Sequence, residues 1–113
     1  MNEYAAAMTE DQFEDWLVEY AQLTGWLVHV ERKAQSARGW RTPIKGNAGF
    51  PDVVLVRGGV VIFAELKSER GTLSAQQKVW GRFLRHAMEV AGGGVWYCVW
   101  QPRDRDTIEG ALR

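Results

Sequence analysis

A Gly-Gly pair between two valine-rich runs is the feature that most constrains the fold of this chain. The runs PDVVLVR (residues 51–57) and VVIFAELK (residues 60–67) flank Gly58-Gly59. Two-residue hairpin turns require positive φ angles, which glycine adopts without steric cost, so the pattern predicts a tight antiparallel hairpin. Counting outward from the turn places Asp52 directly opposite Glu65, at the open end of the hairpin.

The predicted register brings charged side chains together on one face of the hairpin. Residues that lie opposite each other in an antiparallel pair share a face, with Cβ atoms about 5 Å apart. Lys67 projects from the same face, because it lies two residues beyond Glu65. Two opposed carboxylates repel each other unless a positive charge lies between them. That charge is either the ammonium group of Lys67, in a purely structural ion cluster, or a divalent metal ion.

A magnesium ion fits the second alternative. Mg²⁺ takes oxygen ligands and keeps several waters, so two carboxylates and one main-chain carbonyl suffice. The carbonyl of Leu66, between Glu65 and Lys67, is placed to be the third ligand. Aspartate after proline is also ordinary turn chemistry, and a Glu-x-Lys strand is often a surface ion pair. The two patterns in facing register together favour the metal site.

Capping boxes predict where the two main helices begin. Residues 9–12 (TEDQ) open one helix and residues 74–77 (SAQQ) open the other, and apolar residues follow each box at helical spacing. Each of these helices is expected to end at a glycine. A last short helix is expected near the end of the chain, capped by Asp106 or Thr107.

Apolar runs predict two strands besides the hairpin, at residues 26–31 and 95–100. Residues 32–50 contain Ser, Gly, Pro and Asn without a period, which predicts a loop. The resulting order is α-β-β-β-α-β. It predicts a single α/β domain over residues 1–113, with a mixed central sheet flanked by helices.

The charge balance excludes a globally basic nucleic-acid binder, because 14 basic residues oppose 14 acidic ones. The charge is nevertheless segregated along the chain. The segment before the hairpin carries cations and no acid: Arg32, Lys33, Arg38, Arg41 and Lys45. From composition alone, this segment is either a solvated loop or a local site for phosphate groups.

The N-terminal residues MNEYAAAM do not resemble a signal peptide, and no apolar run has the length of a membrane span. The single cysteine, Cys98, cannot form an internal disulfide. We therefore expect a cytoplasmic protein without a membrane partner.

Two short motifs joined by the hairpin carry a family resemblance. G-F-P-D at residues 49–52 and E-L-K at residues 65–67 resemble the PD-(D/E)XK nuclease superfamily, whose core is restriction-endonuclease-like. The preceding helix and the opening L-S-A-Q-Q of the following one are similar to the VRR-NUC (virus-type replication-repair nuclease) domain in its compact stand-alone form. The resemblance extends from about Phe13 to Trp100.

The resemblance implies a Mg²⁺- or Mn²⁺-dependent DNA endonuclease that selects DNA by its structure. Stand-alone members resemble Holliday-junction resolvases, so branched or junction DNA is the expected substrate and a homodimer the expected assembly. The family also points to DNA repair and to a phage origin, which would place the protein in the cytoplasm of a bacterial host. It implies no organic cofactor.

The resemblance also assigns roles to residues. Asp52, Glu65 and the main-chain carbonyl of Leu66 would bind the metal, and Lys67 would be the catalytic lysine. Glu14 matches a helical acid that reaches the metal directly or through water, and Gln77 matches the glutamine that opens the helix after the E-x-K strand. Alternatively, Glu14 is a solvated helix-edge residue, and Gln77 only completes a capping box.

Lys67 has two possible roles that need different protonation states. It either deprotonates the attacking water or, as a cation, orients that water and neutralises charge on the phosphate. Nearby carboxylates favour the charged form, so we expect charge stabilisation and water positioning.

On the nuclease hypothesis, the basic segment of residues 32–45 grips the phosphate backbone without reading sequence. One rival is a flap, nicking or single-strand nuclease with the same site. Another is a catalytically silent DNA-binding module. For the homodimer, the first helix and the strand at residues 26–30 are the expected contact surface.

Overall fold

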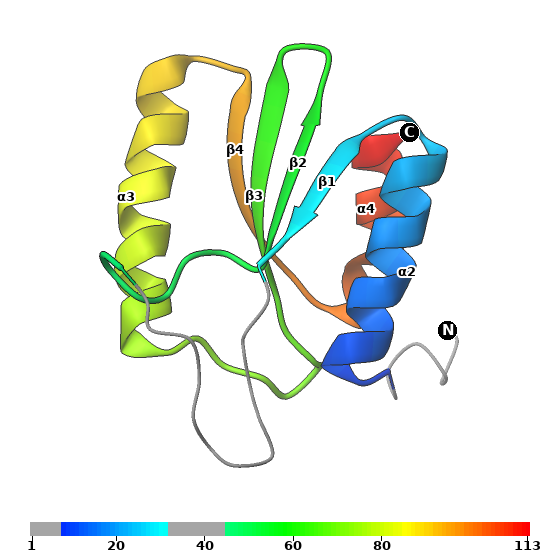
Figure 1. Ribbon diagram of the computed structural model, residues 1–113, viewed down its shortest axis with the longest axis horizontal. Coiled ribbons are helices and arrows are strands. Elements are labelled where there is room, and N and C mark those ends of the chain that lie inside the picture. The colour runs from blue at the N-terminus through cyan, green and yellow to red at the C-terminus, as the bar shows by residue number, and fades with distance from the viewer. Residues whose placement is uncertain (1–7, 32–44) are drawn as a thin grey trace.

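The computed structural model describes residues 8–31 and 45–113, which form a mixed four-stranded sheet with helices on both faces (Figure 1). The strands lie in the order β1-β2-β3-β4, with β3 and β4 parallel and the other neighbours antiparallel. In chain order the elements are α2 (Glu10–Leu23), β1 (Leu27–Val30), β2 (Val53–Arg57), β3 (Val60–Leu66), α3 (Ala75–Ala91), β4 (Val95–Trp100), a 3₁₀ turn (Pro102–Asp104) and α4 (Arg105–Leu112). The predicted α/β fold with a mixed sheet is confirmed.

Both predicted capping boxes are present. The Thr9 hydroxyl accepts from the Gln12 N–H at the start of α2, and the Gln12 side chain accepts from the Thr9 N–H. Ser74 and Gln77 make the same reciprocal pair at the start of α3. These bonds satisfy backbone donors that a helix leaves unpaired at its first turn, which fixes where each helix begins.

The hairpin has the predicted register. Val53 lies opposite Ala64, and Gly58 and Gly59 make the turn with φ angles of 56° and 82°. Because side chains alternate along a strand, Val53 and Ala64 face one side of the sheet, whereas Asp52 and Glu65 face the other.

The main core lies between the sheet and the pair α2 and α4, which cover one face together (Figure 1). It contains Phe13 and Leu17 of α2, Leu55 of β2 and Ile108 of α4, all with fully buried side chains. Helix α3 covers the opposite face, on the side of β4. The face that carries Asp52 and Glu65 is therefore the face toward α3.

The last helix begins earlier than predicted. Asp106 and Thr107 were expected to cap it, but α4 starts at Arg105, directly after a 3₁₀ turn that begins at Pro102. The Asp104 carboxylate accepts from the Gln101 N–H and closes that turn. Proline lacks a backbone N–H, and at the first position of a helical turn that N–H would have no partner within the turn. Pro102 can therefore start the turn, and α4 follows directly from it.

Candidate functional site

The two acids predicted to face each other are both buried at the open end of the hairpin. Asp52 is 4% exposed and Glu65 is fully buried. The Leu66 N–H donates to Asp52 Oδ2 over 2.8 Å, and the Asp52 carbonyl accepts from the Glu31 N–H over 2.7 Å. The backbone of Asp52 is thus bonded to Glu31, directly after β1, and its carboxylate is bonded to Leu66 of β3. The carboxylate therefore has little freedom to turn toward solvent.

Gln77 connects the strand acid to the start of α3. Its side-chain oxygen accepts from the Ser74 N–H over 2.8 Å, and its side-chain amide donates to Glu65 Oε1 over 3.0 Å. Gln77 is 7% exposed, whereas its neighbour Gln76 is exposed. The capping role and the contact with a site acid are therefore not alternatives, because one side chain does both.

Lys67 lies two residues beyond Glu65 and is half-buried. A Cβ atom placed on Gly71 would approach Cβ and Cδ of Lys67 to 3.3 Å, so the loop after β3 folds back along the lysine stem. The choice between a structural ion cluster and a metal site stays a prediction.

Glu14 lies on α2, within electrostatic range of Asp52. Burial raises the pKa of Glu14 above its ordinary value of 4.5, and the charge of Asp52 raises it further. Asp52 is the first of the charges that act on Glu14, ahead of the acids on its own helix. A role of Glu14 at the metal stays a prediction.

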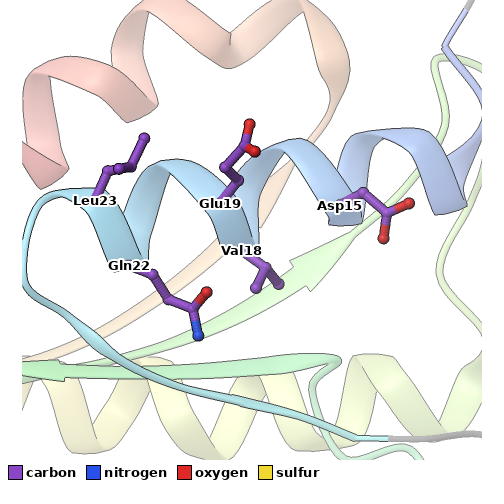
Figure 2. Close-up of a pocket in the computed structure, with 5 residues that line it drawn as sticks. All are labelled: Asp15, Val18, Glu19, Gln22 and Leu23. Atoms are coloured by element: carbon purple, nitrogen blue, oxygen red, sulfur yellow. The ribbon is translucent and has the colours of Figure 1, made fainter.

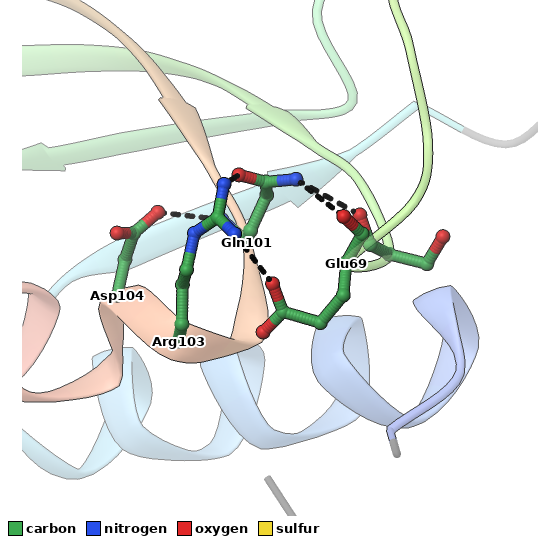
Figure 3. A network of polar contacts seen from close by, with 5 residues as sticks. Glu69, Gln101, Arg103 and Asp104 are labelled. Atoms are coloured by element: carbon green, nitrogen blue, oxygen red, sulfur yellow. Dashed lines mark hydrogen bonds and ion pairs between the residues drawn. The ribbon is translucent and has the colours of Figure 1, made fainter. Parts of the chain in front are cut away.

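A polar network fixes the chain directly after Lys67 (Figure 3). The side-chain amide of Gln101 donates to the carbonyls of Ser68 and Glu69, each over 3.2 Å. Arg103 donates to Gln101 Oε1 over 2.6 Å and pairs with the Glu69 carboxylate over 3.4 Å. The segment after β4 thus holds the exit of β3, where the lysine is.

Tyr97 is a residue near the site that the sequence interpretation missed. It is 5% exposed, and burial raises the pKa of its hydroxyl, with the charge of Glu65 as the second cause. The hydroxyl lies against α3 at Gly81, where an added Cβ would approach it to 2.8 Å. A glycine in the middle of a helix is costly without a packing reason, so Gly81 was the available signal.

The donor set fits a hard divalent cation that keeps waters. Among residues 8–31 and 45–113, no group of three or more His, Cys, Asp or Glu side chains is clustered closely enough to hold a metal ion. Mg²⁺ is commonly bound by one or two carboxylates and several waters, so Asp52 and Glu65 would be enough protein carboxylates to hold it.

Two hollows lie outside this pair of acids. A shallow pocket of about 360 Å³ on α2 is lined by Asp15, Val18, Glu19, Gln22 and Leu23 (Figure 2). Its acidic side chains would repel a phosphate backbone. A second hollow of about 570 Å³ lies beside α3, between Asn47, Ala48, Val79, Trp80 and Phe83.

Of the predicted phosphate-binding residues, only Lys45 lies within the described residues, where it is exposed. The other four lie outside the described residues: Arg32, Lys33, Arg38 and Arg41. A second set of exposed cations lies on α3: Lys78, Arg82 and Arg85. The grip on DNA by the basic segment stays a prediction.

A mixed sheet with helices on both faces, and with a buried acid beside each of two paired strands, is a restriction-endonuclease-like α/β fold. Among solved structures, the chain is similar to a protein described as a VRR_NUC domain. The TM-score is 0.60 and the identity 21%, over 89% of this chain and 95% of that one. The predicted fold is confirmed by this likeness.

No protein-family model matches the sequence, and no curated protein matches it. The helices within the described residues are too short or too polar to cross a membrane.

Proposed function

We propose that this protein is a Mg²⁺- or Mn²⁺-dependent DNA endonuclease that acts on branched DNA in the manner of a Holliday-junction resolvase. The observation that carries the proposal is the pair Asp52 and Glu65, buried and opposed at the open end of the hairpin. Two buried carboxylates at one place offer the oxygen ligands that a hard divalent cation prefers, and the fold is one in which a VRR_NUC domain has been solved.

Asp52, Glu65 and the main-chain carbonyl of Leu66 would hold the metal ion, with Glu14 reaching it through water. A bound divalent cation polarises a phosphoryl oxygen and lowers the pKa of a bound water. The protein contributes the fixed geometry. Asp52 is oriented by the Leu66 N–H, and Glu65 by the side-chain amide of Gln77.

Lys67 supplies a positive charge on the same face. Its stem lies against the loop at Gly71, which limits the directions that the side chain can take. As a cation it can neutralise charge that develops on the phosphate, and it can orient the attacking water. Gln77 acts as a positioning residue, because it contacts Glu65 rather than the substrate.

DNA recognition by shape follows from what surrounds the site. The exposed cations of α3 and Lys45 offer phosphate contacts, which carry affinity but no sequence information. A four-way junction has approximate twofold symmetry and needs two cuts. A homodimer would present two equivalent sites to it.

The test is a cleavage assay on synthetic DNA with Mg²⁺, with Mn²⁺ and with a chelator. Four-way junction, flap, splayed-arm and linear duplex substrates are compared at one salt concentration, because phosphate-driven binding depends on salt. We expect metal-dependent cutting, with the junction preferred. A preference for flaps, nicked duplex or single strands would identify the rival nuclease with the same site.

The matched variants are Glu65→Gln and Glu19→Gln. The first removes the charge of a fully buried site acid, and the second removes the charge of an exposed acid on α2. Glu65→Gln should bind junction DNA but lower the rate of cutting by at least about 100-fold, as expected when a ligand that holds the metal ion is lost. Undiminished cutting by Glu65→Gln would exclude the mechanism, and absence of cutting by the unaltered protein on every substrate would favour a silent binding module.

A further inference from the structure

The hollow of about 570 Å³ beside α3 has the lining of a ligand site. The loop before β2 contributes residues 46–48, and the helix contributes Gln76, Val79, Trp80 and Phe83. Among the described residues that line it, none carries a charge. Its volume lies in the range of about 300–1,000 Å³ that is typical of sites for organic molecules. The lining therefore suits an uncharged ligand with an apolar body.

The Trp80 ring in this hollow is held from two directions. Its indole N–H donates to the Asn47 carbonyl over 3.1 Å, and the Phe50 ring lies nearly perpendicular to it, with centroids 5.1 Å apart. Phe50 makes a second perpendicular contact with Phe63 of β3, at 6.1 Å. The orientation of the indole is thus set before a ligand arrives, which lowers the entropic cost of binding.

Phe83 offers a second aromatic ring in the same hollow and is 71% exposed. Unpaired nucleobases stack on aromatic rings of this kind, because every base has a flat apolar face. A base also has polar edges that need hydrogen-bond partners. Asn47 and Gln76, both exposed, bring amide groups that donate and accept to the same hollow. The residues thus match both parts of a base.

The cations near the hollow match the rest of a nucleotide. Lys45 directly precedes the lining loop, and Lys78 and Arg82 directly precede the two apolar lining residues Val79 and Phe83. All three cations are exposed. They offer contacts for the phosphate groups on either side of a base, whereas the uncharged lining leaves the hollow to the base itself.

The hollow is built on the same segments that carry the site acids. Gly49, with a φ angle of 99°, lies so close to α3 that an added Cβ would approach the backbone carbonyl carbon of Gln76 to 2.6 Å. Asp52 follows Gly49 by three residues. The next residue along α3, Gln77, donates to Glu65. A base in the hollow would therefore belong to a nucleotide near the phosphate that the acids would hold.

We propose that this hollow binds an unpaired nucleobase of the DNA, stacked on Phe83 beside Trp80. The inference rests on the proposed function, which supplies DNA as the ligand. Stacking and pairing in an intact duplex cover the faces of the bases, so a base that is already unpaired enters at the lowest cost. The protein would thus select branched DNA by an unpaired nucleotide and not by its sequence.

Binding is measured by fluorescence anisotropy with a chelator present, so that no DNA is cut. Two labelled duplexes are compared, one with a single unpaired thymidine and one with the same sugar and phosphate but no base. Their charges are equal, so phosphate contacts cancel in the ratio of the two dissociation constants. The unaltered protein should bind the probe with the base at least about fivefold more tightly, as base stacking on an aromatic ring predicts.

Phe83→Ala should abolish this preference and leave the binding of the abasic probe unchanged, because only the stacking face is lost. Phe83→Trp keeps an aromatic face and should retain the preference. Val90→Ala is the matched control and should retain it too. Val90 is 72% exposed on the same helix but does not line the hollow.

Equal binding of the two probes by the unaltered protein would overturn the inference. So would a Phe83→Ala variant that weakens the binding of both probes by the same factor, or a Val90→Ala variant that loses the preference as well. Metal-dependent cutting without any preference for the base would remove this inference and leave the proposed nuclease. Base-dependent binding without cutting on any substrate would support the inference and remove the nuclease.

Discussion

The contact between Gln77 and Glu65 gives a prediction whose size can be worked from the structure. Gln77→Glu keeps a side-chain oxygen for the Ser74 N–H, so the helix cap is retained. It removes the amide that donates to Glu65 Oε1 over 3.0 Å and places a second carboxyl group there. Because both groups are buried, the introduced carboxyl is expected to take up a proton rather than remain charged.

The free-energy cost of adding that proton sets the size of the expected loss of stability. Protonating a glutamate of ordinary pKa about 4.3 costs about 3.7 kcal/mol at pH 7 and about 1 kcal/mol at pH 5. Once protonated, the introduced carboxyl can donate to Glu65 and replace the lost amide. Its pKa is raised in the folded state, so the stability of the variant falls as pH rises above about 4.3. We expect Gln77→Glu to lose about 3–4 kcal/mol of unfolding free energy at pH 7 and about 1 kcal/mol at pH 5.

The assay is urea unfolding followed by tryptophan fluorescence at both pH values, with a chelator present. The control is Gln76→Glu, on the adjacent but exposed glutamine. An acid in the first turn of a helix is favourable by about 0.3–1 kcal/mol, so this variant should be as stable as the unaltered protein or slightly more stable. Equal effects of the two substitutions, or a Gln77→Glu deficit that does not change between pH 7 and pH 5, would refute the reasoning.

Two further substitutions test the surroundings of the acids. Burial raises the pKa of Glu14, so keeping this carboxylate charged lowers the free energy of unfolding as pH rises above 4.5. Glu14→Gln should therefore be more stable than the unaltered protein at pH 7 but not at pH 4. Glu19→Gln, on the exposed side of the same helix, should not show this difference, and an equal gain from both would contradict the placement of Glu14. Gly71→Ala should lower kcat for DNA cutting without unfolding the protein, because the added methyl group displaces the stem of Lys67 at 3.3 Å. Gly110→Ala is the control, because Gly110 has open space around it. An unchanged kcat in Gly71→Ala would show that Lys67 takes no part in the cleavage reaction.

Local patterns in the sequence determined most of the fold. The two capping boxes, the glycine turn and the facing of Asp52 and Glu65 could all be read by counting, because each depends on residues close together in the chain. Strand alternation and helix capping act over a few residues, so neighbours in sequence suffice to define them. The same local rules failed at the last helix, where Pro102 starts a turn before the predicted cap.

Contacts between distant segments were decided only by the tertiary structure. Gln77 bonds Glu65 because α3 returns across the sheet, and Gln101 holds the carbonyls of Ser68 and Glu69 because β4 lies parallel to β3. The exposure of Phe83 is likewise a tertiary result. The spacing of apolar residues shows that a helix has an apolar face but not whether the sheet or a second molecule covers it, because burial depends on what packs against the helix.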